Sequence, residues 1–120
     1  MTMNMKIDFN KENERNLILN TLKENGNVVI RLCLKNKENR KSYFIKINKD
    51  GTYRLYKSVV ESNFVKSFKT EERCKEKKFN KFIDEIILEL SNYNVQEIKT
   101  YKNYINFITR ENKNDLDKKM

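Results

Sequence analysis

Ala, Pro, Trp and His are missing from the 120-residue sequence. The absence of His removes the imidazole base, the Ser-His triad and the common nitrogen ligand of zinc. Only 2 Gly are present, and neither lies in a glycine-rich phosphate loop. We therefore expect a protein that is not an enzyme and that uses no cofactor.

Cysteine and long apolar runs are also scarce. The 2 Cys, Cys33 and Cys74, cannot complete a conventional zinc site without His. No apolar run approaches the roughly 20 residues of a membrane-spanning helix. The first ten residues, MTMNMKIDFN, lack the apolar segment of a signal peptide. These features predict a cytoplasmic protein with two free thiols and no membrane contact.

Lys, Asn and Ile are abundant instead. Their codons are AT-rich, whereas the codons of the scarce Ala, Pro and Gly are not. This bias predicts a gene from a low-GC bacterium, or from a phage or plasmid that lives in one. The chain has 26 Lys and Arg against 17 Asp and Glu, a net charge of +9. An excess of this size is typical of proteins that bind nucleic acid or an anionic membrane surface.

The positive charge is concentrated in one part of the chain. Residues 27–69 contain 11 basic and 3 acidic residues, whereas residues 1–26 contain 4 of each. A genome-wide lysine bias would spread the charge evenly. The clustering therefore indicates that residues 27–69 contribute a basic surface.

Hydrophobic periodicity predicts the order of helices and strands. The expected elements are a helix over 10–25, strands over 27–35, 42–49, 52–59 and 64–69, and a long helix over 70–92. This order predicts an α+β two-layer domain over residues 1–109. We expect a three- to four-stranded antiparallel sheet, with the N-terminal helix and the long helix packed on one face. Residues 110–120 are expected to form a disordered tail.

Residues 95–109 fit two structures. Their β-branched and aromatic side chains favour a strand. The spacing of Ile98, Tyr101, Ile105 and Ile108 also fits a helix. A helix in this position would cover the exposed face of the sheet, so both interpretations stay open.

The turn between the second and third strands decides which residues share a face. A two-residue loop at Asp50-Gly51 would mix aliphatic and charged residues on both faces. A type I turn closed by a left-handed glycine shifts the register by one residue. Ile45 then lies opposite Leu55 on a continuous apolar face. We prefer this register because a half-buried sheet requires such segregation.

The same register predicts two cross-strand pairs on the polar face. Lys46 faces Arg54, and Phe44 faces Tyr56. Like charges directly opposite each other destabilise a sheet by up to about 1 kcal/mol, so solubility alone would not select this pairing. The first strand adds basic residues to the same face. The candidate nucleic-acid-binding residues are Arg31, Lys35, Phe44, Lys46, Arg54 and Tyr56.

These residue types suit nucleic-acid binding. Basic side chains neutralise phosphates and release counterions, and aromatic rings stack on unpaired bases. The expected function is a small basic non-enzymatic protein whose sheet face binds DNA or RNA, with single strands as candidate ligands. The alternative is a small phage or mobile-element inhibitor or adaptor that binds a host protein with an acidic surface. A sheet edge and the long helix are both candidate contacts for a homodimer.

Overall fold

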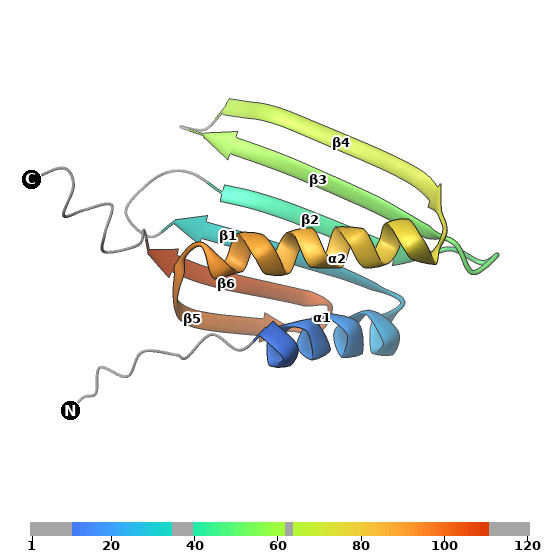
Figure 1. The fold of residues 1–120 in the computed structure, drawn as a ribbon, viewed down its shortest axis with the longest axis horizontal. Helices are drawn as coiled ribbons and strands as arrows, with labels where there is room; N and C mark the ends of the chain where they lie inside the picture. The colour runs from blue at the N-terminus through green and yellow to red at the C-terminus, as the bar shows by residue number, and fades with distance from the viewer. Residues whose placement is uncertain (1–10, 35–39, 62–63, 111–120) are drawn as a thin grey trace, which may run out of the picture.

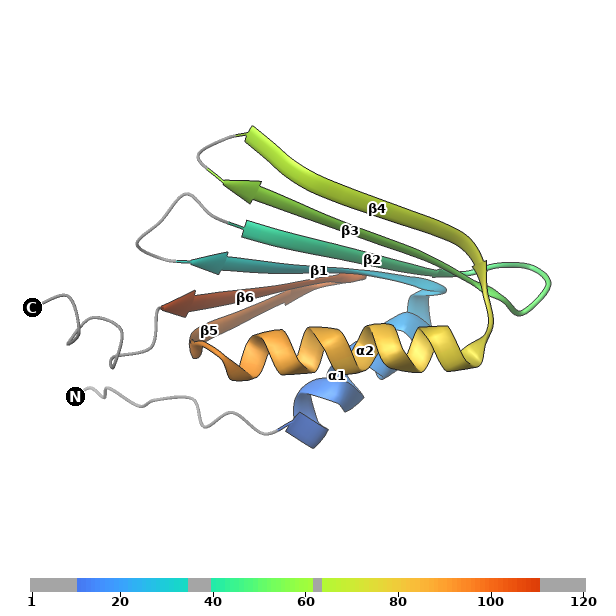
Figure 2. The ribbon, with the colours of Figure 1, turned by 45° about the horizontal axis from the view of Figure 1, so that its top comes forward.

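The structure, a computed structural model, describes residues 11–34, 40–61 and 64–110. Its elements are α1 (Lys11–Asn25), β1 (Asn27–Leu34), β2 (Arg40–Ile47), β3 (Tyr53–Glu61), β4 (Phe64–Cys74), α2 (Glu76–Ser91), β5 (Asn94–Tyr101) and β6 (Tyr104–Arg110). The strands form one six-stranded sheet in the order β4-β3-β2-β1-β6-β5 (Figure 1). Both helices lie on the same face of this sheet (Figure 2). The predicted tail lies outside the described residues, apart from Arg110 at the end of β6.

The α+β class is confirmed, but the expected strand number and pairing are wrong. The sheet has six strands and is mixed, because β1 pairs antiparallel with β2 and parallel with β6. The additional strands are β5 and β6. The chain reaches them only after α2, and β6 then lies beside the first strand of the domain (Figure 1).

Residues 95–109 belong to these two strands, so the strand interpretation is confirmed and the helix is excluded. Tyr101 pairs with Tyr104, which leaves Lys102 and Asn103 as the turn. Lys102 has a φ of 52°, a left-handed conformation that non-glycine residues seldom adopt. Because these residues extend the sheet sideways, they do not cover its exposed face.

The core lies between the helices and the sheet. Ile18 and Leu22 of α1 are buried, as are Ile83, Ile86 and Leu90 of α2. They pack against alternate residues of the sheet, with Val28, Ile30, Tyr43, Ile45, Leu55, Ile105 and Phe107 buried on the same side. The apolar face predicted for the β2–β3 hairpin is therefore the one that the helices cover.

The start of the long helix differs from the sequence prediction. Residues 70–74 extend β4, and α2 begins at Glu76. Thr70 pairs with Tyr56 and Cys74 pairs with Tyr53, so the backbone of this segment is bonded to β3. Acidic residues favour the first turn of a helix, so Glu71 and Glu72 suited a helix that begins at Thr70. Cross-strand pairing and the burial of Cys74 outweigh that preference.

In the described part of the chain, three ion pairs join acidic residues of α2 to the sheet and to α1. They are Lys41–Glu89 at 2.5 Å, Lys57–Glu85 at 3.5 Å, and Arg15–Asp84. The acidic side of α2 is therefore paired with basic residues of the helix-covered face.

Candidate nucleic-acid interface

No described helix or strand lies over the face of the sheet opposite the helices (Figure 2). We call this surface the open face. Side chains alternate across a strand, so the open face is formed by the residues between the buried ones. Its described members in the four central strands are Asn27, Val29, Arg31, Cys33, Arg40, Ser42, Phe44, Lys46, Arg54, Tyr56, Ser58, Val60, Tyr104, Asn106 and Ile108. None of these is acidic.

Four aromatic residues of the open face lie in one line across five strands. The registers pair Tyr101 with Tyr104, Tyr104 with Val29, Val29 with Phe44, and Phe44 with Tyr56. We call these five residues the aromatic row. Tyr101 is 70% exposed, and the other members are partly exposed. Aromatic surface is therefore exposed along this line, with Arg31 over the Tyr104 ring at 5.9 Å and Lys102 over the Tyr101 ring at 5.5 Å.

A second line of open-face residues runs beside the aromatic row and is displaced from it by two residues on each strand. The registers join Lys99, Asn106, Arg31, Ser42 and Ser58 in that order, and we call them the polar row. At about 3.3 Å per residue, the two rows are roughly 7 Å apart. Ser58 is itself buried, so the accessible donors beside the aromatic row are those of Lys99, Asn106, Arg31 and Ser42.

Arg31 occupies the centre of the polar row. Its guanidinium carbon lies 5.9 Å from the centroid of the Tyr104 ring, within cation–π range. Its Nε is buried and has no hydrogen-bond partner among the described residues. The neighbouring Asn106 accepts a hydrogen bond from the Cys33 thiol at 3.5 Å through its carboxamide oxygen, which leaves its amide group as a donor. Arg31 is thus half-buried with unused hydrogen-bonding capacity.

Lys46 and Arg54 lie on the other side of the aromatic row. They are directly opposite each other on β2 and β3, and both are exposed. The nearest carboxylate to this pair is Glu72 at the edge strand, 4.0 Å from Arg54. The Arg54 and Glu72 side chains are 48% and 74% exposed, so solvent screens this contact and it neutralises little charge. The pair remains a site of positive potential.

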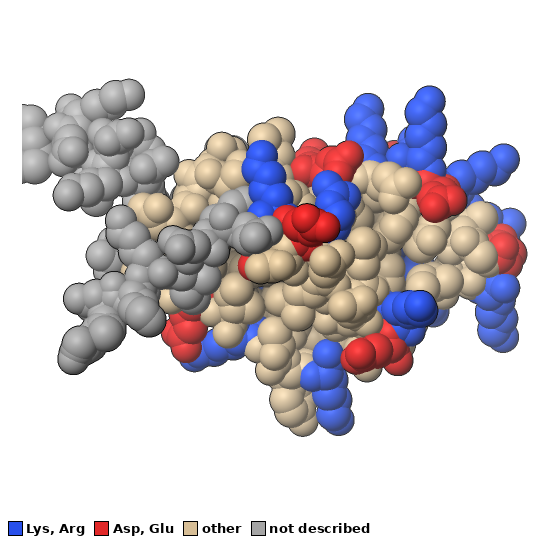
Figure 3. Space-filling view, turned by 60° about the horizontal axis from the view of Figure 1, so that its bottom comes forward, with Lys and Arg blue, Asp and Glu red and all other residues tan. Residues whose placement is uncertain are grey.

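Lys and Arg side chains also gather at the end of the molecule that carries the β2–β3 turn and the start of α2. Figure 3 shows them projecting from this end, which is on the right in Figures 1 and 3, whereas uncharged atoms occupy the centre of the view. Lys49, Lys75, Lys77 and Lys78 of this region are exposed. Lys46 and Arg54 lie on the strands that lead to this end, where exposed acidic side chains lie among the basic ones (Figure 3).

The sequence identified five of these residues correctly as neighbours on one face. Arg31, Phe44, Lys46, Arg54 and Tyr56 all lie on the open face. The sixth candidate, Lys35, lies outside the described residues. The placement of the five confirms the predicted register and leaves their role in binding as a prediction.

Sequence reasoning missed the part of the open face contributed by β5 and β6. Tyr101, Tyr104 and Asn106 come from the segment whose structure was ambiguous. One signal was available, because Tyr101 and Tyr104 flank two polar residues that suit a tight turn. The turn residues alone do not show that this hairpin pairs with β1 in the sheet.

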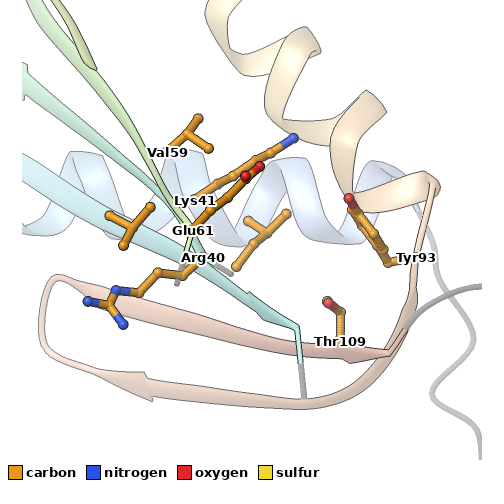
Figure 4. Close-up of a pocket in the computed structure, with 8 residues that line it drawn as sticks. Arg40, Lys41, Val59, Glu61, Tyr93 and Thr109 are labelled. Carbon is orange, nitrogen blue, oxygen red and sulfur yellow. The ribbon is translucent and has the colours of Figure 1, made fainter. Parts of the chain in front are cut away.

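A small cavity of about 150 Å³ lies on the helix-covered side, near the end of α2 (Figure 4). Leu32, Arg40, Val59, Tyr93 and Thr109 are among its lining residues, and the guanidinium of Arg40 extends away from it. Lys41, which also lines it, is held by Glu89 at 2.5 Å. The Lys41 ammonium at this cavity is therefore already engaged in an ion pair.

The two thiols are unpaired, as predicted. Burial, together with the adjacent Glu71 carboxylate, raises the pKa of the Cys74 thiol. A raised pKa keeps the thiol protonated and unreactive. Among the described residues, no three His, Cys, Asp or Glu side chains group closely enough to hold a metal ion.

No protein-family model, curated protein or solved structure matches this chain. Within the described residues, no helix is long and apolar enough to span a membrane.

Proposed function

We propose that this chain is a small non-enzymatic nucleic-acid-binding protein and that its open face binds DNA or RNA. One observation carries the proposal: a line of four aromatic residues crosses a sheet face whose central strands have basic and no acidic side chains. A face that only contacts solvent does not need such an alignment of rings. Glu72 and Glu97 lie on its edge strands, each 4.0 Å from a basic residue, so the absence of carboxylates is confined to the described central strands.

The Lys46–Arg54 pair supports the proposal on energetic grounds. Two like charges directly opposite each other destabilise the free sheet by up to about 1 kcal/mol. A phosphate placed between them replaces repulsion with attraction and releases condensed counterions. The pair therefore favours a polyanion over a neutral ligand.

Salt-dependent binding tests the proposal. Fluorescence anisotropy with labelled DNA and RNA should show an affinity that falls roughly 10- to 100-fold between about 50 and 200 mM salt, as expected for a few phosphate contacts. The Lys46→Glu/Arg54→Glu variant should bind weakly, with a salt slope smaller by about 2. Absence of binding at low salt by the wild-type protein would refute the proposal.

A matched control separates the site from net charge alone. Lys11 and Lys23 are exposed at the two ends of α1, on the helix-covered side. Lys11→Glu/Lys23→Glu changes the net charge by the same amount as the open-face variant. It should retain most of the affinity. Equal losses in the two variants would indicate diffuse attraction to the whole molecule.

The alternative function, an inhibitor or adaptor that binds a host protein, is favoured by one observation at a sheet edge. Phe64, Val65 and Phe68 on β4 are 77%, 63% and 69% exposed. An edge strand with exposed apolar side chains is suited to strand pairing with another chain. A stoichiometric partner in a pulldown that is lost with Phe68→Lys, without oligonucleotide binding, would favour this function.

The homodimer also remains a prediction, and β4 is its best-placed contact. Both edge strands have register irregularities, but β4 exposes the apolar side chains Phe64, Val65 and Phe68, whereas β5 exposes mainly polar residues, which discourage pairing. Light scattering should therefore show a dimer that becomes monomeric with Phe68→Lys. A dimer that persists in this variant would point to another surface.

A further inference from the structure

We infer that the ligand of the open face is a single strand that crosses the β-strands, with its bases on the aromatic row and its phosphates along the polar row. This inference rests on the proposed function and specifies its ligand and path. Three features support it: the spacing of the two rows, the width of the sheet, and the partly buried Arg31 side chain beside the Tyr104 ring.

The two rows match the two parts of a nucleotide. Adjacent strands are about 4.8 Å apart, so the aromatic row spans roughly 19 Å across five strands. Its four rings offer stacking surfaces for up to about four bases, since each base has a π-face. The polar row runs parallel to it at a separation of two residues, within the reach from a base to its own phosphate. A strand that follows both rows makes stacking and backbone contacts together.

A duplex cannot use the same surface. In double-stranded DNA the base faces are stacked on one another, and only base edges are accessible in the grooves. The major groove admits a helix or a two-stranded ribbon, whereas the open face is a six-stranded sheet. The partly exposed rings of Phe44 and Tyr104 would touch only the duplex backbone. The aromatic row therefore discriminates in favour of unpaired bases.

Arg31 is placed to hold a phosphate of such a strand. Its guanidinium, together with the neighbouring Ser42 hydroxyl and Asn106 amide, provides donors from three adjacent strands. A guanidinium binds phosphate through two parallel hydrogen bonds, which a lysine cannot reproduce. The Tyr104 ring beside the guanidinium limits its orientation. We assign Arg31 as the central phosphate contact.

Competition between single strands and duplexes of the same sequence tests the inference. Anisotropy with short DNA and RNA oligonucleotides should show single strands bound at least tenfold more tightly than their duplexes. Phe44→Ala/Tyr104→Ala should lower single-strand affinity by about tenfold for each ring and leave the salt slope unchanged. Phe64→Ala, an exposed aromatic outside the row, serves as the matched control and should bind like the wild type.

Substitution of Arg31 provides a second, independent readout. Arg31→Gln should lower both the affinity and the salt slope, the latter by about 1. Arg31→Lys should restore the slope but not the full affinity, because it keeps the charge and loses the paired hydrogen bonds. Far-ultraviolet circular dichroism and urea unfolding establish that each variant is folded.

Photo-crosslinking of the unmodified protein avoids substitutions altogether. An oligonucleotide containing 5-iodouracil should form adducts with Tyr101, Tyr104, Phe44 or Tyr56, identified by mass spectrometry. Salt-sensitive binding with equal affinity for duplexes, or adducts only outside the aromatic row, would overturn the path while sparing the proposed function. Absence of binding to any oligonucleotide at low salt would overturn both.

Discussion

Phe44 lies directly opposite Tyr56 on the open face, on neighbouring strands β2 and β3. The β2–β3 turn fixes this relationship. The Gly51 N–H donates to the Asn48 carbonyl at 3.0 Å, and the Asn48 N–H donates to the Thr52 carbonyl at 2.8 Å. Gly51 has a φ of +86°, the left-handed position that the predicted turn requires. A shift of one residue in the pairing would place the two aromatic rings on opposite faces of the sheet.

Replacement of Gly51 should therefore destabilise the protein through its backbone. No heavy atom lies within 4 Å of a Cβ added at this position, so Gly51→Ala introduces no clash. We expect the free energy of unfolding to fall by about 1 kcal/mol, because Ala disfavours positive φ. Gly51→Asn should cost less, since Asn tolerates this conformation. Urea denaturation of the three proteins tests the ranking, and an Ala variant as stable as the wild type would contradict it.

The buried hydroxyl of Tyr43 offers a different stability test. The side chain is fully buried, and its oxygen has no hydrogen-bond partner among the described residues. Tyr43→Phe should leave the free energy of unfolding unchanged or raise it by up to about 1 kcal/mol, because it removes an unsatisfied polar group. The ring contact with Phe82 at 5.7 Å is retained. Burial and the nearby Glu89 raise the pKa of Tyr43, so the effect should be constant across neutral pH.

Tyr53→Phe is the matched control for Tyr43. Tyr53 is partly buried and stacks on Phe79 with ring centroids 4.0 Å apart, a contact that Phe preserves. Removal of the Tyr53 hydroxyl should change the free energy of unfolding by less than about 0.5 kcal/mol. A decrease of more than about 1 kcal/mol for Tyr43→Phe alone would mean that the Tyr43 hydroxyl is hydrogen-bonded in solution.

Glu14 should make the protein less stable as the pH rises. Burial raises the pKa of this carboxyl above its ordinary value of 4.5, and one of its oxygens has no hydrogen-bond partner in the described part of the chain. Above pH 4.5 the folded state therefore binds more protons than the unfolded chain. Stability then falls with increasing pH until the folded group has also ionised.

Glu14→Gln should remove this component. The variant should show a flatter decline in the free energy of unfolding between about pH 4.5 and neutrality, and greater stability at pH 7. Chemical denaturation at a series of pH values measures the difference. Glu24→Gln, at an exposed position of the same helix, should retain the wild-type pH dependence. An unchanged profile for Glu14→Gln would show that its carboxylate is solvated.

The sequence predicted the parts of the fold that depend on local patterns. The stripe from Phe79 to Leu90 predicted α2, and the alternation around Gly51 predicted the hairpin register. These signals involve residues close in the chain. Because the register follows from the turn alone, it was sufficient to place Phe44 beside Tyr56 and Lys46 beside Arg54.

The missed features depend on contacts between distant segments. Residues 70–74 contain the acidic pair of a helix start, yet they form a strand because β3 offers a pairing edge. The parallel pairing of β6 with β1 joins residues that are far apart in the chain, such as Val29 and Tyr104. Local periodicity contains no information on that pairing. The aromatic row was consequently predicted only in its β2–β3 half.

The ion pair between Lys41 and Glu89 should contribute more stability than an exposed one. Its atoms are 2.5 Å apart, and the side chains are 29% and 20% exposed. A double-mutant cycle with Lys41→Ala and Glu89→Ala should give a coupling energy of about 1 kcal/mol or more, because partial burial weakens solvent screening. Lys99–Glu97, at 4.0 Å and mostly exposed, should give less than about 0.5 kcal/mol. Equal couplings at the two sites would mean that partial burial adds nothing to the Lys41–Glu89 pair.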